Sequence, residues 1–137
     1  MNINFQELMN NAKEASKNSY SPFSRFAVGA AVITSSGKIY KGCNVENASF
    51  GLTNCAERTC MFTAYADGVR KQDIVALCVY SPKEHLVSPC GACRQVMVEL
   101  LDENCPIILA YEENKSYETT VKELFPLMFT SEDLEND

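Results

Sequence analysis

The sequence predicts an α/β fold in which helices pack on a mixed sheet. Helical patterns alternate along the chain with short apolar runs rich in β-branched residues. The chain has 137 residues, of which 46% are hydrophobic, enough for one buried core. Glycine and proline fall singly where turns are expected, and no repeat or linker divides the sequence. These observations predict one domain over residues 1–137.

The predicted elements are a helix, two strands, a helix, a strand, a helix, a strand, a weaker strand and a short helix. Their expected ranges, in that order, are 4–17, 26–34, 38–45, 55–66, 74–80, 89–101, 106–111, 116–120 and 121–125.

The first helix and the following hairpin are predicted from periodicity. Apolar residues recur at helical spacing from Phe5 to Ala15, and Ser21 with Pro22 then ends the pattern. The next two runs are mostly apolar, and the turn residues 35–37 between them indicate a hairpin.

The second and third helices are predicted from their caps. Asn54 is a suitable N-cap, and apolar residues recur at helical spacing behind it until Asp67 and Gly68. Ser88 followed by Pro89 indicates a cap and a first helical position. The later elements are short apolar runs typical of strands, and a last short helix precedes an acidic tail.

The charge of the chain bears on its partners. Twelve Lys and Arg against eighteen Asp and Glu give a formal net charge of -6, which disfavours nucleic acid and anionic membranes as partners. A small molecule is the expected ligand. We expect a cytoplasmic protein, because the N-terminal segment has no apolar run of signal-peptide or membrane length. The seven cysteines, an odd number, favour metal ligation or thiol chemistry over a disulfide framework.

Three cysteines predict a metal site. Cys90 and Cys93 form a Cys-x-x-Cys pair at an expected helix start, and Cys55 is expected in the first turn of another helix. Three thiolate ligands leave the fourth tetrahedral position of a zinc ion open, as in catalytic zinc sites. The sequence therefore predicts one catalytic zinc per chain.

The charge of such a site must be offset. Zinc with three thiolates carries a formal charge of -1, which weakens its ability to ionise water. Two helix N-termini contribute about +0.5 each, and Arg58 is placed to hydrogen-bond a thiolate. Glu57 is then the predicted base that takes the proton of the water.

Two other interpretations of these cysteines are also consistent with their spacing. Cys90 and Cys93 also resemble a thioredoxin-like redox pair, although Cys55 and Glu57 have no role there. A closed structural zinc site, as in a zinc-stabilised interaction domain, needs a fourth ligand and has no use for Glu57. The candidate fourth ligands are Cys43, Cys60, Cys78, His85 and Cys105.

The motifs resemble those of the small tetrameric cytidine deaminases, whose signature combines cysteine-ligated zinc with an acid–base glutamate. Cys55-Ala-Glu57 and Pro89-Cys90-x-x-Cys93 carry the signature. The resemblance extends over residues 25–31, 42–48, 54–58, 88–95 and 129–134. It implies a three-layer α/β/α sandwich with a mixed five-stranded sheet and helices on both faces.

The resemblance also implies the reaction and the substrate site. Water activated by zinc would add to C4 of cytidine or deoxycytidine, Glu57 would protonate N3, and ammonia would leave, a step of pyrimidine salvage. Asn44 and Glu46 would bind the ribose 3′-hydroxyl, and Phe26 would pack against the base. The implied substrate-binding residues are Phe26, Asn44, Glu46, Phe50, Ala56 and Phe129.

The resemblance further implies a homotetramer with shared active sites, in which Phe129 of one chain closes over the base bound by another. Phe50 stands where the family often has tyrosine, so the ring is retained without its hydroxyl. Related enzymes that act on tRNA adenosine or deoxycytidylate usually have histidine at this position, so Cys55 favours free nucleosides as substrates. The alternative within the superfamily is a deaminase of a cytosine-containing antibiotic.

Overall fold

The computed structural model describes residues 4–134. In chain order its α-helices are α1 (Phe5–Ser16), α2 (Ala56–Ala66), α3 (Gly91–Leu100) and α4 (Val121–Leu124). Its strands are β1 (Gly29–Thr34), β2 (Ile39–Cys43), β3 (Ile74–Ser81), β4 (Pro106–Tyr111) and β5 (Lys115–Thr120). Short 3-10 helices are η1 (Phe50–Leu52), η2 (Lys71–Asp73) and η3 (Ser131–Leu134).

The five strands form one mixed sheet in the order β2-β1-β3-β4-β5. Strand β1 pairs antiparallel with both β2 and β3, and β4 pairs antiparallel with β5. Strands β3 and β4 run parallel, and the connection between them contains α3. The predicted hairpin and the mixed five-stranded sheet are confirmed.

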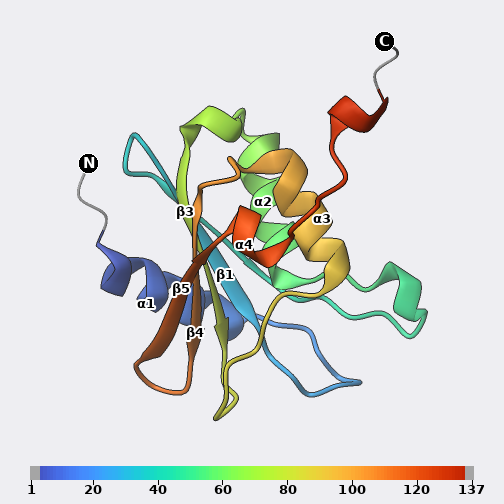
Figure 1. The fold of residues 1–137 in the computed structure, drawn as a ribbon. Helices are drawn as coiled ribbons and strands as arrows, with labels where there is room; N and C mark the ends of the chain where they lie inside the picture. Colours follow the sequence, from blue (N-terminus) through green and yellow to red (C-terminus); the bar gives the residue numbers. More distant parts are fainter. Residues whose placement is uncertain (1–3, 135–137) are drawn as a thin grey trace.

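Helices cover both faces of this sheet, as the three-layer prediction requires. Figure 1 shows α1 on one side and α2, α3 and α4 on the other. Two apolar cores reflect this arrangement. The smaller core packs α1 residues such as Leu8 against Cys78 and Ile108 of the sheet. The larger core lies beneath α2 and α3, with Met61 and Met97 completely buried.

Two glycines let helices approach the sheet closely. A Cβ atom at Gly42 would lie 2.4 Å from the backbone nitrogen of Cys60, so β2 and α2 meet without an intervening side chain. A Cβ at Gly29 would lie 1.9 Å from the carbonyl oxygen of Ala12 in α1. The Gly42 contact fixes α2, and with it residues 55–58, against β2, and the Gly29 contact fixes α1 against β1.

Both predicted helix caps before the cysteine motifs are wrong. Cys55 and Cys90 are themselves the N-cap residues of α2 and α3, not members of the first turns. Asn54 pairs its backbone with Val45 instead, and the Ser88 hydroxyl accepts a hydrogen bond from Arg94. Both sulfur atoms therefore sit at the positive ends of the helix dipoles.

The hairpin strands are shorter than predicted. Strand β1 begins at Gly29, because residues 26–28 belong to a loop that the Asn44 side chain holds. Strand β2 spans Ile39–Cys43 within the predicted range 38–45. Within residues 4–134 no helix has the length and hydropathy needed to cross a membrane.

Candidate active site

The three predicted metal ligands lie together. The Sγ atoms of Cys55, Cys90 and Cys93 are all within 4.8 Å of one another. Cys55 and Cys90 occupy the N-caps of two helices, whereas Cys93 lies on the first turn of α3 and is completely buried. The Cys-x-x-Cys spacing brings Cys90 and Cys93 together because residues three apart share one face of a helix.

The cluster fits a tetrahedral zinc ion. The Cys55 and Cys90 Sγ atoms are 3.8 Å apart, and zinc–sulfur bonds of about 2.3 Å at tetrahedral angles place ligand atoms about 3.8 Å apart. Among the described residues, no further cysteine, histidine or carboxylate joins the cluster. The arrangement therefore offers three ligands and leaves one position open, which is the pattern of a catalytic site.

Arg58 supplies positive charge to the cysteine cluster. Its Nη2 atom donates a hydrogen bond to Cys55 Sγ over 3.2 Å, while its buried Nε has no partner among the described residues. The pKa of the Cys55 thiol is lowered to about 5, first by its hydrogen bond with Cys93 and then by the Arg58 guanidinium. The same bond and burial raise the pKa of Cys93. Arg58 therefore stabilises thiolate at Cys55.

Glu57 lies beside the cluster on α2 with only 5% of its surface exposed. Burial raises the pKa of its carboxyl group above the usual range. A carboxyl group with a raised pKa is more readily protonated than an exposed one, so it can act both as a proton acceptor and as a proton donor. Its position matches the acid–base role that the sequence predicts.

Glu57 and two of the three cysteines line one cavity of about 380 Å³. Four of the six predicted substrate-binding residues also line it, namely Phe26, Asn44, Glu46 and Ala56. A larger hollow of about 940 Å³ lies between the C-terminal part of α3 and the tail, but it lacks the cysteines and Glu57. The smaller cavity is therefore the candidate active site, because the cysteines and Glu57 line it and its size suits a ligand as large as a nucleoside.

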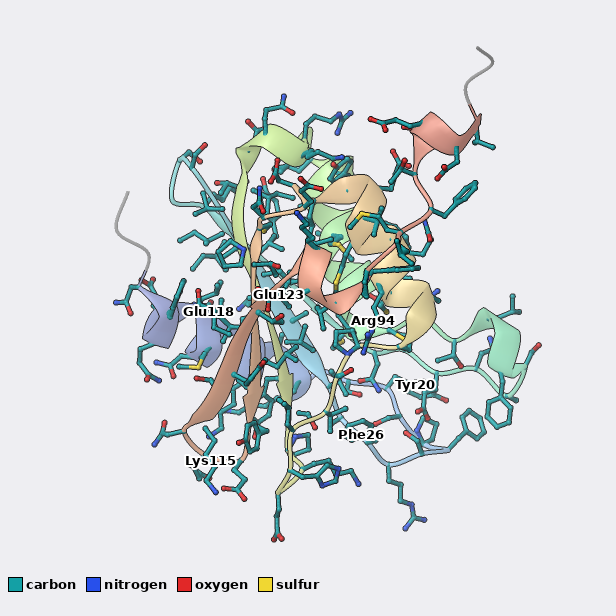
Figure 2. All side chains as sticks on the ribbon, viewed as in Figure 1. Tyr20, Phe26, Arg94, Lys115, Glu118 and Glu123 are labelled. Atoms are coloured by element: carbon teal, nitrogen blue, oxygen red, sulfur yellow. The ribbon has the colours of Figure 1, made fainter. Side chains whose placement is uncertain are left out.

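The segment between α1 and β1 forms one wall of this cavity. Figure 2 shows Phe26 and Tyr20 on this segment. The Asn44 side chain fastens it: Nδ2 donates to the Phe26 carbonyl over 2.7 Å, and Oδ1 accepts the Val28 N–H over 3.0 Å. Lys83 Nζ lies 5.0 Å from the centre of the Phe26 ring, on which the cation can stack.

Two predicted substrate-binding residues lie outside the cavity. Phe50 on η1 is 78% exposed and Phe129 in the tail is 53% exposed, and neither lines the cavity of its own chain. Figure 1 shows both η1 and the C-terminal tail projecting from the body of the fold.

Further residues, which the motifs did not indicate, also shape the site. Ser24, Thr53 and Val87 line the cavity. Arg94, labelled in Figure 2, donates to the Pro89 carbonyl over 2.8 Å and to the Leu124 carbonyl over 2.7 Å. It thereby ties the start of the Cys90 motif to α4. A signal was present only for Arg94, which directly follows Cys93.

Arg58→Ala should release zinc at a higher pH than the parent chain. Protons compete with zinc for each thiolate. Loss of the guanidinium should raise the pKa of Cys55, so protonation of this thiolate should displace zinc at a higher pH. Zinc retained after dialysis against a weak chelator, between about pH 5 and pH 8, measures the shift. Arg58→Lys keeps the charge and should shift the curve less. Superimposable curves for Arg58→Ala and the parent would contradict the role of Arg58.

Comparison with known families agrees with this site. A family model described as the cytidine and deoxycytidylate deaminase zinc-binding region matches residues 3–109. This range includes all three clustered cysteines and Glu57. Zinc is thus the metal of the matching family, and the cysteine cluster of this chain can bind one zinc ion.

Two of the relatives cover nearly the whole chain, and a third covers three quarters of it. A cytidine deaminase from Halalkalibacterium halodurans is 46% identical over 129 residues, covering 94% of this chain and 96% of the relative. The crystal structure of cytidine deaminase from Burkholderia pseudomallei aligns with a TM-score of 0.90 and 42% identity, over 93% of this chain and 100% of that chain. A blasticidin-S deaminase from Bacillus cereus is 31% identical over 111 residues, covering 75% of this chain and 76% of the relative.

Proposed function

This chain belongs to the cytidine and deoxycytidylate deaminase family, and we propose that it converts cytidine and deoxycytidine to uridine and deoxyuridine, with release of ammonia, in pyrimidine salvage. One observation carries the proposal: three clustered cysteines and a buried glutamate meet at a cavity of nucleoside size. The redox-pair interpretation leaves Cys55 and Glu57 without a role, and a closed structural site lacks its fourth ligand among residues 4–134.

Each residue of the site has a definite task in the proposal. Cys55, Cys90 and Cys93 hold the zinc ion, which supplies a Lewis acid that makes water nucleophilic near neutral pH. Glu57 accepts a proton as the water oxygen bonds to C4 and delivers it to N3. It then carries a second proton to the C4 amino group, so that the carbon–nitrogen bond breaks and ammonia leaves.

The remaining cavity residues orient the substrate. Phe26 packs against the pyrimidine, while Asn44 and Glu46 face the sugar. Asn44 has one side-chain N–H left after its bond to the Phe26 carbonyl, so it can still donate to a hydroxyl. Ala56 is buried and lines the cavity beside Glu57, and its small side chain leaves room for the base.

An ultraviolet assay tests the proposed reaction. Purified protein given cytidine should remove the cytosine absorbance band and release one ammonia per nucleoside consumed. A parallel assay with blasticidin S addresses the antibiotic alternative, since a relative of that name shares part of the sequence. Turnover of blasticidin S without turnover of cytidine would replace the proposal by that alternative.

We further propose a cytoplasmic homotetramer in which a single domain, residues 1–137, carries the activity and the active sites are shared between chains. The exposure of Phe50 and Phe129 supports shared sites, because two large rings are left uncovered by their own chain. The free thiols of all seven cysteines fit a reducing compartment.

A mixture of two inactive variants tests the shared site. Glu57→Ala chains lack the base but carry Phe129, while Phe129→Ala chains carry the base but lack the ring. If each site takes these residues from different chains, equal random mixing should restore about a quarter of the sites. Activity should then exceed that of either variant. Native mass spectrometry must confirm mixed tetramers, and in that case activity equal to the mean of the parents would argue against sharing.

A further inference from the structure

We propose that Ser24 is a positioning residue that holds the sugar-facing carboxylate of Glu46 and the base-packing ring of Phe26 in register. The inference rests on the proposed function, because it concerns how that substrate is oriented. Ser24 lines the cavity together with both residues. Ser24 belongs to no recognised motif and to no helix or strand, since residues 22–28 form a loop.

The Ser24 hydroxyl bridges the two substrate-facing residues directly. Its Oγ donates a hydrogen bond to Glu46 Oε2 and accepts the backbone N–H of Phe26 over 3.1 Å. On the far side of the same residue, the Phe26 carbonyl accepts the Asn44 amide over 2.7 Å. The backbone of Phe26 is thus held from both sides, once by Ser24 and once by Asn44.

The Glu46 carboxylate is correspondingly fixed in orientation. Its Oε1 accepts two backbone N–H groups, from Phe23 over 3.0 Å and from Ser24 over 3.1 Å. Because a carboxylate oxygen has two lone-pair directions, Oε1 is filled, whereas Oε2 retains one direction beside the Ser24 hydroxyl. Oε2 is therefore the atom left to accept a sugar hydroxyl. The Ser24 hydroxyl also lowers the pKa of Glu46, which keeps it an acceptor.

The backbone explains why the loop needs this support. Arg25, between Ser24 and Phe26, has a φ of 57°, a left-handed conformation that is unfavourable for a residue with a Cβ atom. Its N–H closes the turn on the Ser21 carbonyl over 2.9 Å. Without the hydroxyl bridge, this turn has fewer contacts to keep Phe26 and Glu46 at their present separation.

Ser24→Ala tests the inference with two substrates. For cytidine, kcat/KM should fall about tenfold, as expected for loss of a hydrogen bond to a charged group. For 3′-deoxycytidine, which lacks the hydroxyl that Glu46 would accept, the fall should be about threefold or less, since only the support of Phe26 is lost. Ser21→Ala is the matched control: its hydroxyl accepts from Ser19 in the same loop and touches neither Glu46 nor Phe26.

A second comparison separates positioning from direct contact. If Ser24 acts through Glu46, Ser24→Ala should cost less in a Glu46→Gln background than in the parent. Equal losses for both substrates, or additive losses in the double variant, would overturn the proposal. Thermal unfolding of each variant monitors the fold, and Ser24→Cys, which keeps the shape with a weaker donor, replaces Ser24→Ala if that variant does not fold.

The controls distinguish this proposal from the proposed function. A parent chain that does not deaminate cytidine contradicts the function. An active parent whose Ser24 variants behave like Ser21→Ala contradicts only the role of Ser24.

Discussion

Glu57→Ala is expected to keep its zinc and to lose turnover by about 10³-fold to 10⁴-fold, the upper part of the range of general acid–base catalysis. The glutamate is placed on α2 two residues from Cys55 but is not one of the clustered metal ligands. Its removal should therefore leave the thiolate cluster intact while removing the group that moves protons at N3 and at the amino group. Zinc analysis and steady-state rates on one preparation measure both effects.

Glu57→Gln is the matched control for the shape of this side chain. It fills the same buried volume and still forms hydrogen bonds, but it cannot accept a proton. Both variants should be similarly inactive. Neither should unfold, because each substitution replaces a buried ionisable group, whose burial is costly, by an uncharged side chain. Turnover within tenfold of the parent in Glu57→Gln, with zinc bound, would remove Glu57 from its assigned role.

The metal cluster was predictable because its geometry is largely local. Cys90 and Cys93 lie one helical turn apart, so their meeting follows from spacing alone once α3 is recognised. Three of the candidate fourth ligands, Cys60, Cys78 and Cys105, are buried core residues that lie outside the cluster. Cys55 is 35 residues from Cys90, and its expected place at the start of another helix was the signal that it could supply the third ligand.

The exact helix starts were not predictable from capping preferences. Asparagine and serine are better N-caps than cysteine, so Asn54 and Ser88 were the natural choices. Both side chains form other local hydrogen bonds: Asn54 Nδ2 donates to Thr59 over 3.0 Å, and Ser88 accepts from Arg94. Cys55 and Cys90 occupy the N-cap positions instead, and their side chains form no capping hydrogen bond.

The substrate-facing loop was the least accessible part of the site. An apolar run from Phe26 onward predicted a strand, but the strand begins at Gly29. The loop shape depends on the left-handed backbone of Arg25 and on hydrogen bonds to Asn44 and Glu46, which are far away in the sequence. Such long-range side-chain contacts leave no periodic signal in the chain.

Cys93→Ala is expected to lose both its zinc and its activity. Cys93 is the buried member of the three-cysteine cluster, and two remaining thiolates are too few to retain zinc against dilution and weak chelators. Turnover should fall by about a thousandfold or more, because the Lewis acid and the water that it activates are lost together. Metal analysis and the cytidine assay on the same preparation check the two losses.

Cys78→Ala separates the loss of a ligand from the loss of a buried thiol. Cys78 lies in β3, is as completely buried as Cys93, and packs on the opposite face of the sheet beneath α1. Its replacement should cost about 1 kcal/mol of unfolding free energy while leaving one zinc per chain and turnover close to that of the parent. If Cys93→Ala also keeps a full equivalent of zinc and normal turnover, the three-cysteine site is wrong. If Cys78→Ala loses zinc to the same extent, the loss reflects damage to the fold, and ligation must then be tested by Cys90→Ala, whose exposed side chain contributes little to the core.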